Sequence, residues 1–282
     1  MEQIDCLICK NSDYDSFAKV EDRFKKKSIY NLVKCKKCNF VYLNPRPNKF
    51  DIIKHYDHHD YLPHNKNIFI SLAQSITFRW KYYIINKFIK FGKIIDIGGG
   101  KGEFCNFMIK NGWKEKIYMY ESSSKKTNHE DNYKLISSYD DFFDDSIKII
   151  TMWHSLEHLH DINDIMKFAY KILDNDGYIF VAVPNLDAYE RSFLKEKWIA
   201  YDAPRHLYHF TPNTIERFFT NFNFKLVKQF AMYQDSIFNI LLSLKPLSLK
   251  KIIYFIFLIF ITYFKILINN KSASSILYVF KK

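Results

Sequence analysis

Glycine is scarce in this chain, and most of it stands in one place. Four of the seven glycines in 282 residues fall within the segment IIDIGGGKGEF, residues 94–104. An apolar run that ends in Asp96, followed by a glycine cluster and a helix-like start, predicts a strand, a tight turn and a helix. In α/β folds this unit presents bare backbone to a nucleotide-like ligand. The segment therefore predicts an α/β fold with a ligand site at this turn.

The segments around the glycine cluster alternate between strand-like and helix-like patterns. Amphipathic helices are expected over 69–91 and 161–173. Apolar or alternating segments predict seven strands, at 93–98, 116–123, 133–138, 147–153, 177–185, 224–232 and 275–282. This alternation indicates a doubly wound, mostly parallel seven-stranded sheet whose last two strands pair as an antiparallel hairpin. Ligands of such sheets bind beyond the carboxyl ends of the strands.

Two ligand classes compete for the glycine turn. A dinucleotide site needs G-x-G-x-x-G, and the glycines at 98, 100 and 102 do not follow that spacing. A phosphate-binding Walker loop needs G-x-x-x-x-G-K-[ST], which Lys101 alone does not make. Glu121, at the end of the second strand, can accept hydrogen bonds from both hydroxyls of a ribose. The turn and Glu121 together predict an adenosyl ligand without phosphates.

Four of the five cysteines form two matched pairs, Cys6 with Cys9 and Cys35 with Cys38. Two CxxC loops can place four thiolates around one ion, and a closed four-sulfur set suits structural zinc. A redox role needs one CxxC in a thioredoxin-like context, which this sequence does not show. We expect a small amino-terminal lobe whose folding depends on the metal. The fifth cysteine, Cys105, is expected to be a small buried residue.

A second cluster of metal-binding residue types follows this lobe. The segment HYDHHDYLPH contains four histidines, His55, His58, His59 and His64. The carboxylates and tyrosines among them are typical of a polar surface loop, which we favour over a second metal site.

The motifs in chain order resemble those of class I S-adenosylmethionine-dependent methyltransferases. The resemblance rests on IIDIGGGKGEF, on Glu121, on WHSLEHLHD at 153–161 and on LDNDGYIFVAVPN at 173–185. The LEHL block resembles the subgroup that modifies quinones, sugars and other small molecules. The double CxxC and the segment DAPRHLYHFTPNTIERFF are similar to bacterial zinc-bearing sugar methyltransferases, often found with surface-polysaccharide genes. The resemblance implies a Rossmann-like methyltransferase fold and S-adenosylmethionine as cofactor.

The resemblance also implies which residues hold the cofactor. The residues expected on its methionine and ribose side are Asp96, Gly98, Gly99, Gly100 and Gly102. Glu121 is expected to bind the ribose hydroxyls. Trp153 and His154 are expected beneath the cofactor near the sulfonium, although core packing is an equal alternative for Trp153.

The acceptor side is expected in residues 184–212, which follow the fifth strand. Methyl transfer needs the acceptor aligned with the sulfonium and, where it is a hydroxyl or a carbon acid, deprotonated. Histidine suits this at neutral pH. His206 is the first candidate for the base, with His154 and His158 in reserve.

Three more residues of this segment are expected to bind the substrate. Arg205 is a candidate for a diphosphate or carboxylate of the acceptor, and Trp198 and Tyr208 for its other contacts. The alternative is that Arg205 and His206 only cap the next helix, which is expected to begin with Thr211 as N-cap and Pro212 at its first position.

A long apolar segment, KKIIYFIFLIFITYFKILINN, lies between the last two predicted strands. Its uninterrupted run, 252–264, covers about 20 Å as a helix, less than the roughly 30 Å hydrocarbon core. Both of its ends must return to one sheet, so we expect a helical hairpin with a turn at Pro246 rather than a single crossing. We favour peripheral membrane contact through 237–268, with lysines near anionic head groups. Capping of the active site and oligomer contact are the alternatives.

The net charge and the amino-terminal residues limit which binding partners and which cellular location we expect. The formal net charge of +12 would suit nucleic acid or anionic membranes. The lysines are scattered, however, and the densest run, Lys25–Lys27, is typical of a solvated face, so no nucleic-acid partner is expected. MEQIDCLICK shows no secretory signal, which predicts a cytoplasmic location, extending to the inner face of the membrane.

These features predict a five-part chain: a zinc lobe over 1–48, a linker with helices over 49–92, a catalytic core over 93–232, an apolar insertion over 233–275 and a final strand over 276–282. The predicted function is methyl transfer to oxygen or carbon of a small molecule, a nucleotide-linked sugar or surface-polysaccharide precursor. A quinone or lipid acceptor is the first alternative. An RNA-binding or RNA-modifying zinc protein is the second alternative. The zinc lobe does not favour it, because the lobe shows ordinary aromatics and few basic residues.

Overall fold

The computed structural model describes residues 1–24, 28–56, 68–121, 133–136, 138, 142 and 146–282. Three of the four clustered histidines, His58, His59 and His64, and the lysine run at 25–27 lie outside these residues.

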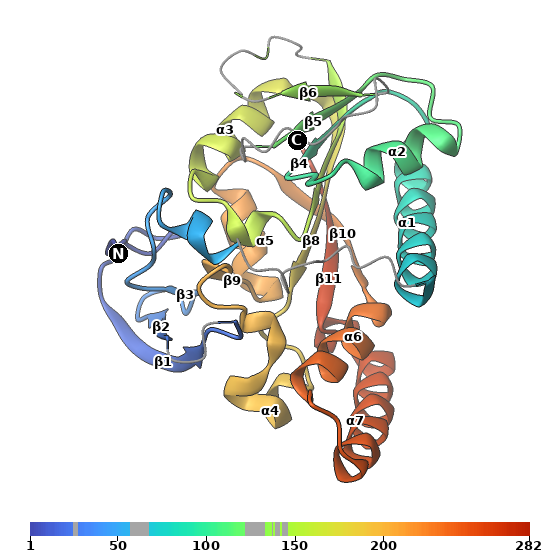
Figure 1. Cartoon of the computed structure of the whole chain (residues 1–282). Coiled ribbons are helices and arrows are strands. Elements are labelled where there is room, and N and C mark those ends of the chain that lie inside the picture. Colours follow the sequence, from blue (N-terminus) through green and yellow to red (C-terminus); the bar gives the residue numbers. More distant parts are fainter. Residues whose placement is uncertain (25–27, 57–67, 122–132, 137, 139–141, 143–145) are drawn as a thin grey trace.

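A mixed sheet forms the centre of the molecule (Figure 1). Its strands in chain order are β4 (Lys93–Ile97), β5 (Ile117–Tyr120), β6 (Lys134–Ile136), β7 (Ile147–Trp153), β8 (Leu173–Pro184), β10 (Lys225–Ala231) and β11 (Ser275–Lys281). In the described part of the chain the sheet has seven strands, in the order β10-β11-β8-β7-β4-β5-β6. Only β11 runs against its neighbours. The predicted seven-stranded, mostly parallel sheet is confirmed, including the pairing of its last two strands.

Helices cover both faces of this sheet (Figure 1). On one face lie α1 (Ile68–Phe88) and α2 (Glu103–Lys110), with Ile85 and Met108 in the core beneath them. On the other lie α3 (Ile162–Ile172) and α5 (Pro212–Thr220). The predicted start of α5 is confirmed, because Thr211 caps it and Pro212 follows. Buried apolar strands with helices on both sides make the fold doubly wound.

The amino-terminal residues form a second, smaller sheet beside the first (Figure 1). Its strands are β1 (Tyr14–Glu21), β2 (Ile29–Cys35), β3 (Val41–Leu43) and β9 (Tyr208–His209). A 3₁₀ turn at Ile52–His55 follows it. β9 belongs to the segment after β8, and its two residues pair with residues of β3 that lie 166 and 168 positions earlier in the chain. The lobe and the segment at 184–212 therefore share one sheet, which sequence alone did not predict.

Two helices form the insertion between β10 and β11. They are α6 (Tyr233–Ser243) and α7 (Leu249–Ile268), joined through Pro246, so the predicted helical hairpin is confirmed. α7 has 20 residues, about 30 Å, and is longer than its uninterrupted apolar run. By length and composition alone it could cross a membrane, and 17% of its 18-residue apolar window is buried. One such helix is weak evidence for a span, and both ends of the hairpin return to paired strands.

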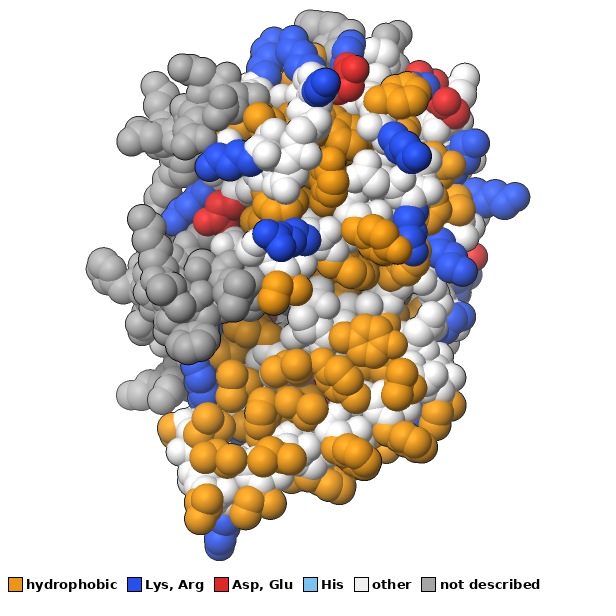
Figure 2. All heavy atoms as spheres, turned by 90° about the vertical axis from the view of Figure 1, so that its right-hand side faces the viewer, with side chains coloured by type: hydrophobic (Ala, Val, Ile, Leu, Met, Phe, Trp, Pro, Cys, Tyr) orange, Lys and Arg blue, Asp and Glu red, His pale blue; other side chains and the backbone are white. Residues whose placement is uncertain are grey.

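Apolar side chains gather on the outer surface of this hairpin, and Figure 2 shows them as a continuous area on one end of the molecule. The most exposed members on α7, between 61% and 75%, are Leu249, Ile253, Ile256, Phe260, Phe264, Leu267 and Ile268. We call these seven residues the hairpin face. The opposite side of α7 is buried at Leu258 and Ile266. Exposed apolar side chains that gather on one helix face make this face a candidate interaction site.

Candidate active site

The glycine turn joins β4 to α2 at the carboxyl edge of the sheet. Gly98 and Gly100 have φ of 74° and 58°, a region that side chains enter only at a cost. A Cβ at Gly98 would lie 2.4 Å from the Cβ of Ser155, so the turn packs directly on the loop after β7. A Cβ at Gly100 would meet no described atom within 4 Å. The backbone at Gly100 is therefore bare and accessible to a ligand.

The other two glycines of the turn serve close packing. A Cβ at Gly99 would lie 2.7 Å from the Cγ of Met119, and one at Gly102 would collide with the hydroxyl of Tyr133. They let the turn lie tightly against β5 and the start of β6.

Two carboxylates flank the turn, as predicted. Asp96 on β4 is 1% exposed, and the Thr151 hydroxyl donates to its Oδ1 at 2.6 Å. Burial raises the pKa of Asp96 to about 6, against the opposing effect of that hydrogen bond. Glu121 follows β5, and the Gly100 N–H donates to its Oε2 at 3.1 Å. Glu121 thus lies beside the bare backbone, where a ribose could be held.

A buried lysine that the sequence analysis did not single out lies next to these acids. Lys81 on α1 is 6% exposed, and its Nζ lies 4.3 Å from the centroid of the Trp153 ring. Burial lowers the pKa of Lys81 to about 8, while the charges of Asp235 and Asp96 oppose that shift. The indole N–H of Trp153 is buried and has no hydrogen-bond partner among the described residues. Two buried donors beside the turn suit an anionic group of a ligand.

Trp153 also packs edge-on against Phe104 of α2, with ring centroids 5.2 Å apart. Its predicted place beneath the cofactor and its predicted core role are therefore both compatible with the structure.

His154 stands directly after β7 in a strained conformation, with φ of 52°. Its Nε2 lies 3.0 Å from Oδ2 of Asp235 on α6, and its Nδ1 lies 3.6 Å from Oε1 of Glu157. Burial would lower the pKa of His154, but the two carboxylates outweigh burial and raise it to about 9. His154 is therefore an imidazolium at neutral pH and unsuited to be a base. The ion pair also ties the apolar hairpin to the site.

His158 and His206 lie together near Glu157, with ring centroids 4.6 Å apart. His206 Nδ1 lies 2.8 Å from the carbonyl oxygen of Ala200, so this nitrogen carries the proton and Nε2 can accept one. His158 Nδ1 likewise lies 2.9 Å from the carbonyl oxygen of Arg205. Burial and the neighbouring His206 lower the pKa of His158 to about 4. His206 keeps the geometry of a base.

Glu157 lies between these histidines and is 1% exposed. Burial would raise the pKa of its carboxyl, but His154, His158 and His206 together lower it to about 2. Neither carboxylate oxygen has a hydrogen-bond partner in the described residues. Glu157 belongs to the LEHL motif, but the sequence alone assigned it no role.

Arg205 is fully buried and engaged by two acids. Its guanidinium donates to Asp22 of the amino-terminal lobe at 3.2 Å and to Asp202 at 2.7 Å, and its pKa is raised, because these carboxylates outweigh burial. It also donates to the carbonyl oxygen of His55 at 3.3 Å. The structure thus places Arg205 between the lobe and the core. Its predicted contact with substrate stays a prediction, and the observed pairs favour a structural role different from the expected helix cap.

Trp198 and Tyr208 are also buried, 2% and 3% exposed. Trp198 packs edge-on against Tyr201, and the hydroxyl of Tyr208 accepts a hydrogen bond from Arg46 at 2.7 Å. Their predicted substrate contacts stay predictions, because each side chain packs inside the protein.

The four paired cysteines converge at the start of the lobe, with sulfur atoms within 4.8 Å of one another. Cys6 and Cys38 lie 3.3 Å apart, and Cys9 and Cys35 lie 3.5 Å apart, far longer than a disulfide. Burial would raise the pKa of Cys35, but backbone N–H groups of Cys38 and Lys37 help to lower it to about 7. Zn–S bonds of about 2.3 Å need sulfurs roughly 3.8 Å apart. The set therefore fits a tetrahedral zinc ion.

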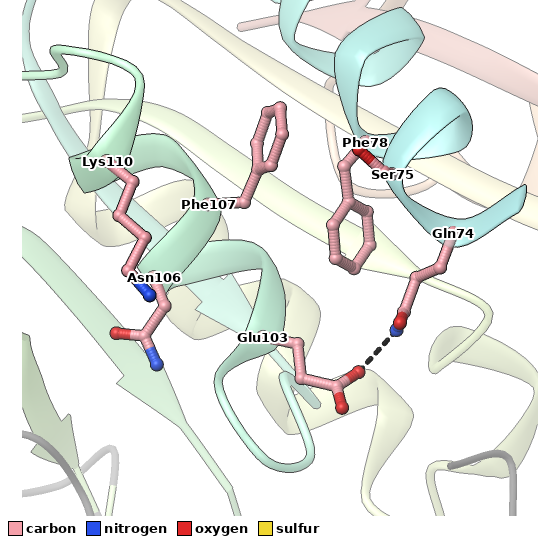
Figure 3. Close-up of a pocket in the computed structure, with 7 residues that line it drawn as sticks. All are labelled: Gln74, Ser75, Phe78, Glu103, Asn106, Phe107 and Lys110. Atoms are coloured by element: carbon pink, nitrogen blue, oxygen red, sulfur yellow. Dashed lines mark hydrogen bonds between the residues drawn. The ribbon is translucent and has the colours of Figure 1, made fainter. Parts of the chain in front are cut away.

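A shallow groove of about 310 Å³ lies between α1 and α2 (Figure 3). Phe78 and Phe107 face it from the two helices, and Gln74 bonds to Glu103 at one end. No residue of the glycine turn lines it. The groove lies outside the predicted site, although Glu103 at its border directly follows the glycine turn as the first residue of α2.

Comparison with known proteins supplies the family. A family model described as a methyltransferase domain matches residues 66–229. No curated protein sequence matches the chain.

Several solved structures share the fold. Mycolic acid cyclopropane synthase CmaA1, complexed with SAH and CTAB, is 12% identical with a TM-score of 0.52, and the match covers 76% of this chain and 85% of that one. A SAM-dependent methyltransferase from Archaeoglobus fulgidus is 17% identical, with a TM-score of 0.48 over 74% and 94% of the two chains. The cyclopropane synthase MmaA2 from Mycobacterium tuberculosis is 14% identical, with a TM-score of 0.49 over 81% and 88%. At these identities the likeness shows the fold alone.

Proposed function

The chain belongs to the methyltransferase domain family and is an S-adenosylmethionine-dependent methyltransferase, and we propose that its acceptor is a nucleotide-linked sugar or surface-polysaccharide precursor. The methyl group would go to an oxygen or a carbon of that acceptor. The observation that carries this proposal is the group of Glu157, His158 and His206, which begins two residues after the Ser155 that packs on Gly98 of the glycine turn. A polar cluster of this kind suits a hydroxyl or an acidic C–H group, which must lose a proton during transfer.

The residues around the turn fit the cofactor. Bare backbone at Gly100 leaves room for close approach, and Glu121 offers a carboxylate to the ribose hydroxyls. Lys81 would hold the carboxylate of the amino-acid arm, because it is a buried ammonium at the same site. When bound, the cofactor supplies a methyl group on a sulfonium that needs no protonation of the leaving group.

The protein's part in transfer is alignment and removal of a proton. His206 Nε2 would take the acceptor's proton, since its Nδ1–H is held by Ala200. His154, fixed by Asp235, would keep a positive charge at the carboxyl edge. The resemblance of the double CxxC lobe to bacterial zinc-bearing sugar methyltransferases also supports a sugar acceptor.

Labelled methyl donor, incubated with the full chain, tests this assignment against a panel of nucleotide sugars and cell-envelope extracts. Incorporation into a sugar supports the proposal. His206→Asn should abolish transfer while the protein binds S-adenosylhomocysteine normally. Undiminished turnover would remove His206 from the mechanism.

A quinone or lipid acceptor is the second candidate, and the hairpin face favours it. Asp235 on α6 contacts His154, so the hairpin adjoins the candidate active site. An acceptor carried by a membrane would reach the site from a docked hairpin. Transfer to a lipid extract but to no nucleotide sugar would select this candidate.

We also propose that the hairpin face binds an anionic membrane surface. Its seven apolar residues are exposed, and the basic residues along the hairpin are Lys245, Lys250, Lys251 and Lys265, with no acid on α7. Apolar area flanked by lysines suits an interfacial helix. Phe260→Glu should abolish flotation with phosphatidylglycerol vesicles, whereas Phe91→Glu, at a similarly exposed Phe outside the hairpin, should not. Equal flotation of both variants, or none by the wild type, would refute this proposal.

For the cysteine set we propose one structural zinc ion. Four thiolates leave no open position for chemistry, so the ion would stabilise the lobe. Metal analysis of the purified chain should give one zinc per chain, and Cys6→Ser should remove it.

A further inference from the structure

We propose that Glu157, His158 and His206 form a second metal site, which binds a divalent first-row cation on the acceptor side of the glycine turn. The inference rests on the proposed methyl transfer for its role, but not for its geometry. The site is separate from the four cysteines in both position and ligand type.

The three side chains converge although they come from different segments. Glu157 and His158 lie in the 3₁₀ turn after β7 (Leu156–His158), and His206 lies just before β9. One potential ligand atom of each lies within 4.8 Å of the others. Metal bonds of about 2.0–2.2 Å place tetrahedral ligand atoms roughly 3.3–3.6 Å apart, so closure by about 1.5 Å or less would surround an ion.

The backbone fixes which histidine nitrogens are available. Nδ1 of His206 faces the carbonyl of Ala200 at 2.8 Å, and Nδ1 of His158 faces the carbonyl of Arg205 at 2.9 Å and the Tyr56 hydroxyl at 3.0 Å. A carbonyl oxygen only accepts, so each Nδ1 carries a proton and each Nε2 carries a lone pair. Histidines that bind metal commonly have their second nitrogen held in this way.

The carboxylate of Glu157 gives an independent indication of a ligand. It is 1% exposed, and neither oxygen has a hydrogen-bond partner in the described part of the chain. The nearest imidazole nitrogens, His154 Nδ1 at 3.6 Å and His206 Nε2 at 4.0 Å, are too far for hydrogen bonds. Leaving a buried carboxylate without hydrogen bonds is costly. An ion between Glu157 and the two Nε2 atoms would satisfy it.

The donor set selects the kind of ion. Two imidazoles and one carboxylate suit zinc, iron, cobalt or manganese in the divalent state, and three protein ligands leave coordination positions open. His206 is 12% exposed, so the cluster is not sealed from solvent.

An open position there would bind the acceptor hydroxyl. The ion lowers the pKa of that hydroxyl as a Lewis acid, and its proton passes to water. The oxygen then forms a bond to the methyl carbon, while the carbon–sulfur bond breaks and its electron pair stays on sulfur. The ion does not change its oxidation state. In this form of the enzyme His206 holds the ion instead of taking the proton itself.

Mn²⁺ binding to the full, zinc-loaded chain tests the site. Mn²⁺ binds poorly to thiolates but is bound by carboxylate and imidazole ligands, so the four cysteines do not compete for it. The free Mn²⁺ spectrum, followed by electron paramagnetic resonance, should show one ion bound per chain. Glu157→Gln and His158→Asn should weaken binding at least tenfold. His160→Asn is the matched control, because His160 is two residues away and contacts the carbonyl of Pro47 instead.

Two results would overturn the proposal: no uptake of Mn²⁺ or Co²⁺ by the wild type, or equal uptake by wild type and both cluster variants. The wild-type measurement does not depend on how the variants fold, and S-adenosylhomocysteine affinity checks their folding. Methyl transfer without ion binding refutes the metal site alone. Ion binding without any methyl transfer refutes the proposed function alone.

Discussion

Replacing Gly100 with Ala separates the cofactor role of the turn from its structural role. Gly100 has φ of 58°, so an alanine there costs about 1–2 kcal/mol of backbone strain. The new Cβ meets no described atom within 4 Å, so packing adds no further cost in the free protein. For a chain of this size we expect the melting temperature to fall by roughly 2–8 °C. The added methyl group would stand where the backbone contacts the cofactor.

We therefore expect Gly100→Ala to weaken binding of S-adenosylhomocysteine at least tenfold, about 1.4 kcal/mol or more. Gly112→Ala is the matched control, because Gly112 also has a positive φ, 89°, and open space around it, but lies beyond α2. It should lower the melting temperature by a similar amount and leave the affinity unchanged.

Isothermal titration calorimetry and thermal unfolding of the three proteins decide the matter. Wild-type affinity in Gly100→Ala would refute the claim that this backbone contacts the cofactor. An equal loss of affinity in Gly112→Ala would show that backbone strain, not a lost contact, weakens binding.

Three further predictions address the charged groups and the metal. Lys81→Met should weaken the affinity for S-adenosylhomocysteine about tenfold or more in calorimetry, and should leave the affinity for 5′-methylthioadenosine within about twofold, because only the former ligand has a carboxylate. Equal losses of affinity for the two ligands would refute the contact. Asp235→Asn should lower the pKa of His154 from about 9 in an NMR titration. Because the folded pKa is raised, the stability from this pair is present below about pH 6.5 and disappears as pH rises through 9, so wild type and variant should converge in alkali; an unchanged titration would contradict the ion pair. Cys35→Ser should remove the zinc and lower the melting temperature, whereas normal zinc content would refute the four-cysteine site.

The central sheet and its cofactor turn could be predicted because their signals are local. Alternating apolar segments, a rare glycine cluster and an acid after the next strand each depend on neighbours in sequence. The hairpin followed from the same logic, since a long apolar segment stands between two strands that pair. Segment boundaries shifted by a few residues, as expected for element ends.

The acceptor side could not be predicted in the same way, because its contacts join distant segments. Lys81 looks like a surface lysine in sequence, and only burial against Trp153 shows otherwise. The signal was present in its spacing, three residues after Phe78 and four before Ile85, on the face of α1 that packs on the core. Arg205 looked like an anion-binding residue, and its partner Asp22 lies 183 positions earlier.

The amino-terminal lobe and the apolar hairpin both contact the same group of histidines in the core. Both therefore contribute to the arrangement of the site. From the amino-terminal lobe, Asp22 holds Arg205, whose carbonyl oxygen in turn fixes Nδ1 of His158. From the hairpin, Asp235 holds His154 in its strained conformation. The glycine turn needs neither contact, since it is built from β4, α2 and the loop after β7. Loss of zinc should therefore reduce methyl transfer more than cofactor binding, because the lobe contacts the acceptor side, whereas the proposed cofactor contacts come from the sheet, the glycine turn and α1.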